Sequence, residues 1–286
     1  MEVSLGELSN VKGIGKKTLE RIREYKLTSG GYISEYNGSL HLERNSINQG
    51  DCLELMNGIK DNSVDMILAD LPYGTVACSW DSIIDLDKLW LQYERVIKKD
   101  DGAIVLTADG VFTFKLYHSN PELFKYKLVW DKKHSTGFLN ANRMPLRQHE
   151  DILIFYKNLP TYNPIMETRG KPRQKGSYNK KKGNGDMCYN SFDNIEKYNN
   201  KYYPTSILTF SSANQKDKIH PTQKPVALFE YLIKTYTNKG DLVLDNVSGS
   251  GTTAVACINT SRNYICIEQN KKYYEQSVER VKNLKN

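Results

Sequence analysis

Long apolar runs, a secretion signal and cysteine pairs are all missing from this sequence. No uninterrupted apolar stretch reaches the roughly 18 residues that a membrane-spanning helix needs. The first residues, MEVSLGELSN, do not have the basic-then-apolar order of a secretory signal. The five cysteines are odd in number and form no CxxC pair, which argues against a disulfide framework or a zinc site. We therefore expect no membrane association, no bound metal, and a reduced, cytoplasmic location.

The positive charge of the chain is concentrated in one segment. The 286 residues, which suit one large α/β domain with an insertion or two modest domains, have a net charge of +7. Residues 157–219 hold 12 Lys and Arg against 5 Asp and Glu, a difference of +7, so the rest is neutral. A solvated, partly disordered insertion can have this composition. The localised charge and the tyrosines interleaved with it favour a surface that binds the phosphate backbone of nucleic acid.

Buried strands and amphipathic helices alternate on both sides of this segment. Strands are expected at 46–51, 64–70, 102–108, 126–132, 151–157, 240–245 and 262–268. Helices are expected at 52–59, 85–98, 225–237, 251–259 and 271–284. This alternation predicts an α/β fold with a mostly parallel sheet that helices cover on both faces.

Three of the predicted strand ends carry residues suited to a ligand, and ligands bind such sheets at the carboxyl ends of the strands. The segment LDNVSGSGTTAVA (244–256) runs from a strand through a glycine-rich turn into a helix, and no Lys follows in the order of a P-loop. Glu268 lies about twenty positions after the turn, where an acidic residue usually binds ribose hydroxyls. Asp51 ends another strand, where it also fits as a helix N-cap. Together these residues favour an adenosine-containing cofactor.

Three short segments carry a family resemblance. DLPY (70–73) is similar to a D-P-P-Y catalytic motif, DNVSGSGTT (245–253) to the cofactor motif D-P-F-x-G-S-G-T-T, and HPTQKP (220–225) to the segment that usually precedes the cofactor strand. On these residues the chain resembles the DNA methyltransferases that modify amino groups, adenine N6 or cytosine N4, in the permuted order of their β class. The resemblance implies a Rossmann-like methyltransferase fold, circularly permuted motifs, a basic target-recognition insertion, and S-adenosylmethionine as cofactor.

This resemblance divides the chain into four parts. It implies a catalytic half at 40–156, a target-recognition insertion at 157–219 and a cofactor-binding half at 220–286. The preceding part, 1–39, contains a segment (8–25) that resembles the hairpin of a helix-hairpin-helix module, followed by a linker rich in Gly and Ser. Backbone amides in such hairpins bind DNA phosphates without sequence preference, although a capped surface helix is the alternative.

The resemblance also implies a set of cofactor-binding residues, namely Asp51, Cys52, Asp70, Thr222, Lys224, Asp245, Gly249, Ser250, Gly251 and Glu268. Within this set the glycine-rich turn would hold the methionine part, Glu268 the ribose, and the pair at 51–52 the adenine. Thr222 and Lys224 would lie by the cofactor carboxylate. Two departures from the family pattern are Asn246-Val247 in place of Pro-Phe and Leu71 in place of the first Pro.

The proposed chemistry explains why the catalytic residues would be Asp70, Leu71, Pro72 and Tyr73. The amino group of adenine is a poor nucleophile because its lone pair is delocalised into the ring. The Asp70 carboxylate and the Leu71 carbonyl can each accept one N–H, which favours a pyramidal nitrogen aimed at the sulfonium methyl. Pro72 fixes the backbone bend, and Tyr73 offers a stacking face for a base that has left the duplex. Taken alone, DLPY is also compatible with a plain strand-ending turn.

Two further regions are expected to contact DNA. Residues 130–156 are interpreted as a loop that closes over the flipped base, with Phe138 as a second stacking face and Arg143 as a DNA contact. Ordinary surface loop residues are the alternative. In the basic insertion, Lys180, Lys181 and Lys182 are expected to contact phosphates.

Four functions fit this sequence to different degrees. Methylation of adenine N6 in double-stranded DNA leads, because the family tends to place Ser at position 70 for cytosine, and this chain has Asp. Methylation of cytosine N4 is second, and methylation of a protein glutamine amide is more distant. A catalytically inactive DNA-binding protein on the same fold is the non-enzymatic alternative. The resemblance points to a prokaryotic or phage protein and leaves open a homodimer and a cognate restriction endonuclease as partners.

Overall fold

The computed structural model describes residues 41–74, 83–170, 200–212 and 223–284. The chain divides into two compact units, with boundaries between Asn163 and Pro164 and between Thr205 and Ser206. The larger unit contains the main sheet, and each unit is described by itself below.

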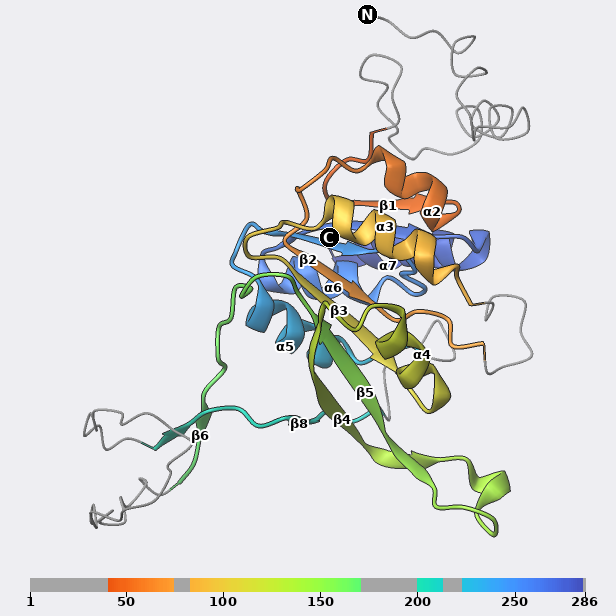
Figure 1. Ribbon diagram of the computed structural model, residues 1–286, viewed down its shortest axis with the longest axis vertical. Helices are drawn as coiled ribbons and strands as arrows, with labels where there is room; N and C mark the ends of the chain where they lie inside the picture. The colour runs from red at the N-terminus through yellow and green to blue at the C-terminus, as the bar shows by residue number, and fades with distance from the viewer. Residues whose placement is uncertain (1–40, 75–82, 171–199, 213–222, 285–286) are drawn as a thin grey trace, which may run out of the picture. The chain divides into compact units, whose positions relative to one another are not determined.

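The larger unit is built on an eight-stranded sheet in the order β1-β10-β9-β2-β3-β5-β4-β8 (Figure 1). The strands are β1 (Ser46–Gln49), β2 (Met66–Ala69), β3 (Ala103–Ala108), β4 (Phe124–Thr136), β5 (Arg147–Phe155), β8 (Ile207–Thr209), β9 (Leu242–Asp245) and β10 (Asn263–Glu268). Only β5 is antiparallel to its neighbours, and the other described pairings in this sheet are parallel. The mostly parallel sheet predicted from the sequence is therefore confirmed.

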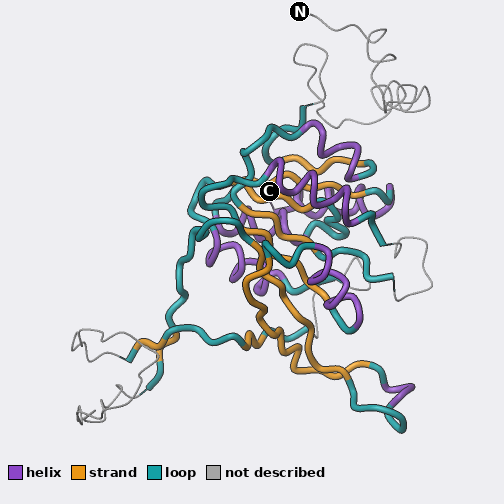
Figure 2. Tube along the Cα trace, viewed as in Figure 1, coloured by secondary structure: helices purple, strands orange, loops and turns teal. Residues whose placement is uncertain are grey.

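Helices cover both faces of this sheet, as Figure 2 shows by colour. Two separate apolar clusters fill the space between the helices and the sheet. On one face lie α2 (Cys52–Leu55), the 3-10 turn η2 (Met56–Gly58), α3 (Leu86–Val96) and α4 (Val111–Ser119). On the other face lie α5 (Val226–Tyr236), α6 (Thr252–Thr260) and α7 (Lys271–Leu284).

The local sequence explains these elements. The strands β2, β3 and β9 are buried along their whole length, which is why they read as continuous apolar runs. Helix α3 begins after Asp85, whose side chain accepts a hydrogen bond from the backbone N–H of Lys88 at 3.2 Å. Its buried residues Leu89, Trp90 and Tyr93 recur at helical spacing. Each large apolar side chain buried in this way contributes about 1.5–3 kcal/mol to folding.

The structure corrects the prediction for residues 130–156. The predicted strands 126–132 and 151–157 lie largely within β4 and β5, but both strands continue into the presumed loop and form a long hairpin. Its tip contains a 3-10 turn, η3 (Phe138–Asn140). Residues 147–150 of β5 pair with β4 but not with β3, so the hairpin extends past the end of β3 (Figure 1). Residues 133–136 and 147–149 are exposed or half-buried, so they show no apolar alternation that would mark them as strand.

Two further differences concern elements that the sequence did not predict. Helix α4 exposes Val111 and Phe114 and buries Phe112 and Leu116, so it lacks the one-sided apolar pattern of a surface helix. Strand β8 lies within the predicted insertion, 157–219, but pairs with β4 and extends the main sheet. The smaller unit, Pro164–Thr205, contains the two-stranded antiparallel sheet of β6 (Glu167–Thr168) and β7 (Lys201–Tyr202).

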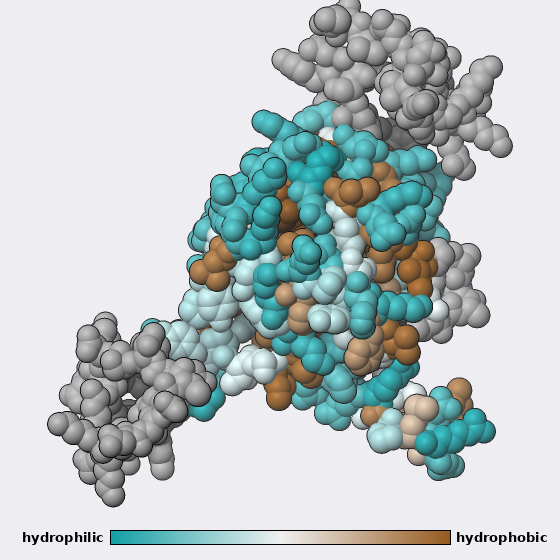
Figure 3. All heavy atoms as spheres, in the orientation of Figure 1, coloured by the Kyte–Doolittle hydropathy of each residue, from teal (hydrophilic) through white to brown (hydrophobic). Residues whose placement is uncertain are grey.

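Among the described residues no helix is long and apolar enough to cross a membrane. On the face seen in Figure 3, hydrophobic residues form separate patches among hydrophilic ones.

Candidate active site

Four carboxylates lie at the ends of four adjacent strands in the larger unit. In the sheet order β1-β10-β9-β2, Asp51 follows β1, Glu268 ends β10, Asp245 ends β9 and Asp70 follows β2. The strand pairs are all parallel, so these side chains come to the same edge of the sheet. This is the edge at which parallel sheets bind their ligands.

The glycine-rich turn after β9 is anchored by Glu268. The backbone N–H of Gly249 donates to Glu268 Oε2 at 2.7 Å, and that of Asn270 donates to Oε1 at 2.7 Å. Gly249 has φ +51°, and a Cβ built on it would meet no atom within 4 Å among the described residues. Gly251 has φ +72°, but a Cβ there would lie 2.9 Å from Ser277 Cβ of α7. One glycine therefore leaves open space at the turn, and the other permits close packing of two helices.

Asp245 is buried beneath this turn. It accepts hydrogen bonds from the Thr253 hydroxyl and, at 3.1 Å, from the backbone N–H of Val247. Burial raises the pKa of Asp245 to about 7, although both hydrogen bonds act to lower it. The side chain therefore stabilises the turn through its hydrogen bonds with Val247 and Thr253. The nearby charges of Asp70 and Glu268 also raise its pKa, so the three carboxyl groups interact.

Two buried polar atoms of the same turn lack hydrogen-bond partners in the described part of the chain. They are Asn246 Nδ2 and Ser248 Oγ, in residues that are 1% and 7% exposed. Buried polar groups are normally paired, so such orphaned atoms mark a place where a bound molecule can supply the partner. Open space at Gly249, unpaired polar atoms and a row of carboxylates fit a cofactor that carries hydroxyls and positive charge. S-adenosylmethionine has these properties.

The predicted adenine-binding pair, Asp51 and Cys52, lies at the beginning of α2. The Asp51 carboxylate accepts from the backbone N–H of Leu53 at 2.9 Å and of Glu54 at 3.2 Å, so it caps this helix. Burial raises the pKa of the Cys52 thiol to about 11, so the thiol stays protonated. A role for either residue toward adenine remains a prediction.

Asp70 has three partners among the described residues. Its Oδ1 accepts from the Tyr73 hydroxyl at 2.9 Å and from the Thr107 hydroxyl, and its Oδ2 meets Lys224 Nζ at 2.7 Å. Burial, together with the charges of Asp70 and Glu150, raises the pKa of Tyr73 well above its usual value, so the phenol remains a donor. The Tyr73 ring stacks on Phe112 with 5.0 Å between centroids. Leu71, the departure from the family pattern, is buried in the core.

A chain of buried charges continues from Asp70 across β5 to β4. Lys224 Nζ also lies 3.2 Å from Glu150 Oε2, and Glu150 Oε1 lies 3.2 Å from Lys132 Nζ. The side chains of Lys224, Glu150 and Lys132 are only 7%, 14% and 8% exposed. Burial acts to lower the pKa of Lys224, but the charges of Asp70 and Glu150 and the hydrogen bonds to them outweigh it, and its pKa is raised. Lys224, predicted to lie by the cofactor carboxylate, is therefore a charged partner of Asp70.

The remaining predicted residues lie elsewhere or outside the described residues. Ser250 is buried in the glycine-rich turn, where its hydroxyl is 3.3 Å from that of Thr252. Phe138 is 70% exposed at the hairpin tip, and Arg143 is exposed near it. Thr222, the lysines at 180–182 and the N-terminal segment 1–39 lie outside the described residues. In the described ranges, no group of three or more His, Cys, Asp or Glu could hold a metal ion.

Sequence reasoning missed Thr107, Phe112, Glu150 and Lys132 as parts of the site. Lys132 lay at the end of the predicted strand 126–132 and Glu150 in the presumed loop, and nothing in the sequence linked either residue to Asp70. Thr107 is a polar residue in an otherwise apolar strand, AIVLTA, and this was the one local signal available. A buried hydroxyl near a strand end must find a partner, and here the partner is Asp70.

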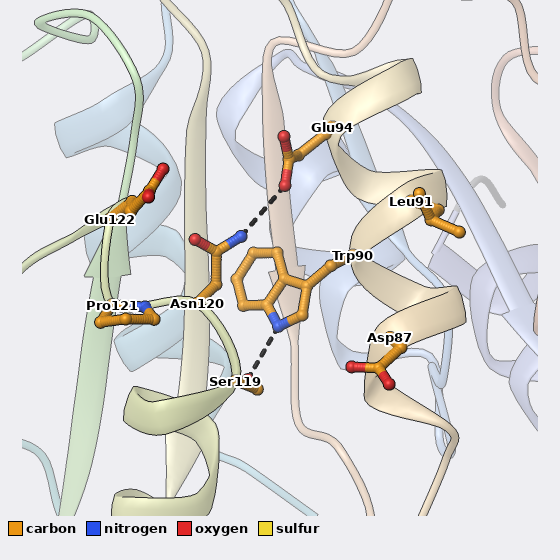
Figure 4. Close-up of a pocket in the computed structure, with 8 residues that line it drawn as sticks. All are labelled: Asp87, Trp90, Leu91, Glu94, Ser119, Asn120, Pro121 and Glu122. Carbon is orange, nitrogen blue, oxygen red and sulfur yellow. Dashed lines mark hydrogen bonds between the residues drawn. The ribbon is translucent and has the colours of Figure 1, made fainter.

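A separate pocket of about 440 Å³ lies on the surface between α3 and the segment after α4 (Figure 4). Trp90 Nε1 donates to Ser119 Oγ at 2.8 Å, and Asn120 Nδ2 donates to Glu94 Oε1 at 3.0 Å. None of the residues that line it is among the strand-end carboxylates or the partners of Asp70. The pocket was not predicted and is not part of the candidate site.

Comparison with known proteins gives one matching family. The N6/N4 methyltransferase family, described as DNA methylase, matches residues 64–279. The Type II methyltransferase M.HpaI of Haemophilus parainfluenzae is 27% identical over 243 residues, covering 81% of this chain and 72% of the relative. The DNA adenine methyltransferase YhdJ of Escherichia coli K12 is 27% identical over 259 residues, covering 84% of this chain and 83% of the relative.

Solved structures agree with this fold. The M1.HpyAVI–SAM complex superposes with a TM-score of 0.57 at 24% identity, covering 82% of this chain and 98% of the other. The PvuII DNA methyltransferase, which is cytosine-N4-specific, gives a TM-score of 0.60 at 17% identity, covering 84% and 87%. The predicted Rossmann-like methyltransferase fold is thereby confirmed.

Proposed function

Because the chain belongs to the N6/N4 DNA methylase family, we propose that it transfers a methyl group from S-adenosylmethionine to the N6 amine of adenine in double-stranded DNA. The observation that carries this proposal is the position of Asp70. It lies at the same edge of the sheet as Asp51, Asp245 and Glu268, and its carboxylate is held by Tyr73 and Thr107. A base and a cofactor bound at this edge would meet at Asp70.

The residues of this edge would share the work of binding and orientation. The bound S-adenosylmethionine supplies an electrophilic methyl group on a positively charged sulfur. Asp70 and the Leu71 carbonyl accept the two N–H groups of the amine and direct its lone pair toward that methyl. The N–C bond forms as the S–C bond breaks, and the electron pair of the broken bond stays on sulfur. The methylated nitrogen then loses one proton to water. Tyr73 stacks on the flipped base.

Adenine is favoured over cytosine by the residue at position 70. The resembling enzymes that modify cytosine tend to have Ser there, and the relative YhdJ is named a DNA adenine methyltransferase. Cytosine N4 is the second candidate, since the PvuII cytosine-N4 enzyme has the same fold. The other interaction surfaces follow the same proposal: the basic insertion, Phe138 and Arg143 contact DNA, while a homodimer and a cognate endonuclease remain open.

Modified-base sequencing of DNA from cells that express the protein tests this proposal. We expect N6-methyladenine within one short sequence context, and none in cells that express Asp70→Ala. Digestion of the same DNA to nucleosides and mass spectrometry would identify the modified base independently. N4-methylcytosine would replace the adenine assignment by the cytosine one. DNA without either modified base, from cells that hold the folded protein, would refute the proposed activity.

A further inference from the structure

The position of Lys224 between two carboxylates suggests a role for Glu150, and this inference rests on the proposed function. A carboxylate offers about four acceptor positions, two on each oxygen. Within the described residues Asp70 Oδ1 accepts from both Tyr73 and Thr107, and Oδ2 meets only Lys224. The acceptor position left for a substrate amine is therefore on Oδ2, the same oxygen that Lys224 contacts.

A lysine on that oxygen is by itself unfavourable for methyl transfer. The donor sulfur is positively charged, and positive charge develops on the amine as the new bond forms. A lone Asp70–Lys224 pair is neutral, and its cationic end lies beside the reacting groups. Asp70, Lys224 and Glu150 carry charges that sum to −1, which is the sign that stabilises both the donor and the developing charge. Lys132, on the far side of Glu150 from Lys224, brings the sum of the four charges to zero.

Glu150 is held in its contact with Lys224 by the surrounding side chains. Its Oε2 is buried and accepts no well-formed hydrogen bond among the described residues, so the ion pair with Lys224 is the compensation it has on that side. Its Oε1 is held by Lys132, which is also buried. Glu150 is thus shared between two lysines, just as Lys224 is shared between two carboxylates.

We propose that Glu150 is a positioning residue for methyl transfer: by sharing Lys224 with Asp70, it offsets the positive charge of the lysine beside Asp70 and leaves an acceptor position at Asp70 Oδ2 for the substrate amine. Lys132 acts in the opposite direction, because it draws Glu150 away from Lys224. Glu150 therefore makes the electrostatic potential at Asp70 more negative, and Lys132 makes it less negative. Neither residue touches the reacting atoms in this proposal.

The test compares binding of two ligands that differ in charge at sulfur. S-adenosylmethionine carries a positive sulfur and S-adenosylhomocysteine does not, so their Kd ratio reports the electrostatics of the site. With the full chain, calorimetry on Glu150→Gln should show a Kd for S-adenosylmethionine raised about tenfold, the effect of one charge a few ångströms away in a partly solvated site. The Kd for S-adenosylhomocysteine should change less than about twofold, and single-turnover methylation of DNA should slow by about tenfold or more.

Lys132→Gln provides a second variant with the opposite expectation. It should lower the Kd for S-adenosylmethionine about threefold and leave the homocysteine Kd unchanged, because Glu150 then pairs with Lys224 alone. Lys127→Gln is the matched control. It removes an ion pair with Asp151 (2.8 Å) that joins the same two strands but does not reach Asp70, so the Kd ratio should not move.

The outcomes separate this inference from the proposed function. Opposite shifts of the Kd ratio in the two variants support the inference. Equal changes for both ligands, or wild-type behaviour of Glu150→Gln, overturn it and reduce Glu150 to a structural residue. If Glu150→Gln does not fold, the sign of the Lys132→Gln shift decides alone, and a weaker affinity for S-adenosylmethionine overturns the inference. A wild-type chain that binds S-adenosylmethionine and methylates DNA retains the proposed function in every case, and one that does neither loses it.

Discussion

Replacement of Asp70 by Asn should abolish most of the methyl transfer while leaving the shape of the site intact. The amide oxygen can still accept from Tyr73 and Thr107, which hold one side of the group. The other side becomes an NH₂ group, which donates and cannot accept from the amine. It also faces the Lys224 ammonium, now 2.7 Å from Oδ2, where two donors repel each other. The variant therefore loses both the acceptor and the negative charge.

The expected decrease in the methyl-transfer rate of Asp70→Asn follows from the role of the Asp70 carboxylate as hydrogen-bond acceptor for the amine. Removal of one preorganised partner of developing charge costs about 2.7–4 kcal/mol in other enzymes, or about 10²–10³ in rate. Asp70 contributes charge as well as a hydrogen bond, so we expect a decrease at the upper end of this range. Folding is affected less, because Lys224 keeps Glu150 as a partner. A loss of about 1–3 kcal/mol corresponds to a Tm lower by several degrees.

The assay is transfer of radiolabelled methyl to DNA in a single turnover with saturating cofactor, alongside calorimetric binding of S-adenosylmethionine. We expect the Kd for S-adenosylhomocysteine to stay within a few-fold of wild type, because the turn around Gly249 and Glu268 is untouched. The Kd for S-adenosylmethionine should rise about tenfold, because a negative charge beside the sulfonium is lost. Asp61→Asn is the control, since it alters an exposed ion pair with Arg95 at the surface. A variant at position 70 that retains a tenth or more of the wild-type rate would refute the role assigned to this carboxylate.

Three other predictions concern the turn and the insertion. Asp245 binds its proton more tightly in the folded chain (pKa about 7) than at its usual 3.8, so its contribution to stability falls as pH rises between these values. Asp245→Asn should flatten the change in Tm between about pH 4 and pH 7, and an unchanged slope would contradict this. Gly251→Ala should lower Tm more than Gly249→Ala, because the new methyl group at 251 meets Ser277. Gly249→Ala should chiefly weaken cofactor binding. A larger loss of Tm for Gly249→Ala than for Gly251→Ala would contradict this assignment. Neutralising the lysines at 180–182 should reduce the slope of log K against log salt by up to about 2.7, and an unchanged slope would make them solvated surface.

The fold could be predicted because its elements satisfy local rules. A strand buried on both faces must be a continuous apolar run, and a helix on a sheet must be apolar on one side. Residues 66–69 and 86–96 follow these rules and were assigned correctly. Helix α4 does not, because Val111 and Phe114 are apolar on its exposed side. In the hairpin of β4 and β5, the inner parts at 126–132 and 151–157 were predicted as strands. Residues 133–136 and 147–149 were not, because they are exposed or half-buried and have no apolar alternation to read.

The site was predictable where backbone conformation restricts the residue type. Gly249 and Gly251 both have positive φ, and Pro72 follows a strand end, so each leaves a mark in the sequence. Partnerships between side chains leave no such mark. Lys224 and Asp70 are joined by a 2.7 Å contact across 154 positions, and Glu150 reaches Lys224 from a strand of opposite direction. The folded chain brings these residues together from β5, from the end of β2 and from the segment before α5, so their connection became visible in the structure and not before.

The structure also explains how the chain accommodates its departure from the family cofactor motif. Asn246 replaces a proline, and its Oδ1 accepts a hydrogen bond from the Tyr93 hydroxyl of α3 at 2.6 Å. Tyr93 is completely buried, so a proline at 246 would leave its hydroxyl without this partner, at a cost of about 1–3 kcal/mol. The unusual asparagine and the buried tyrosine therefore form a matched pair, and the substitution is not a sign of a decaying site.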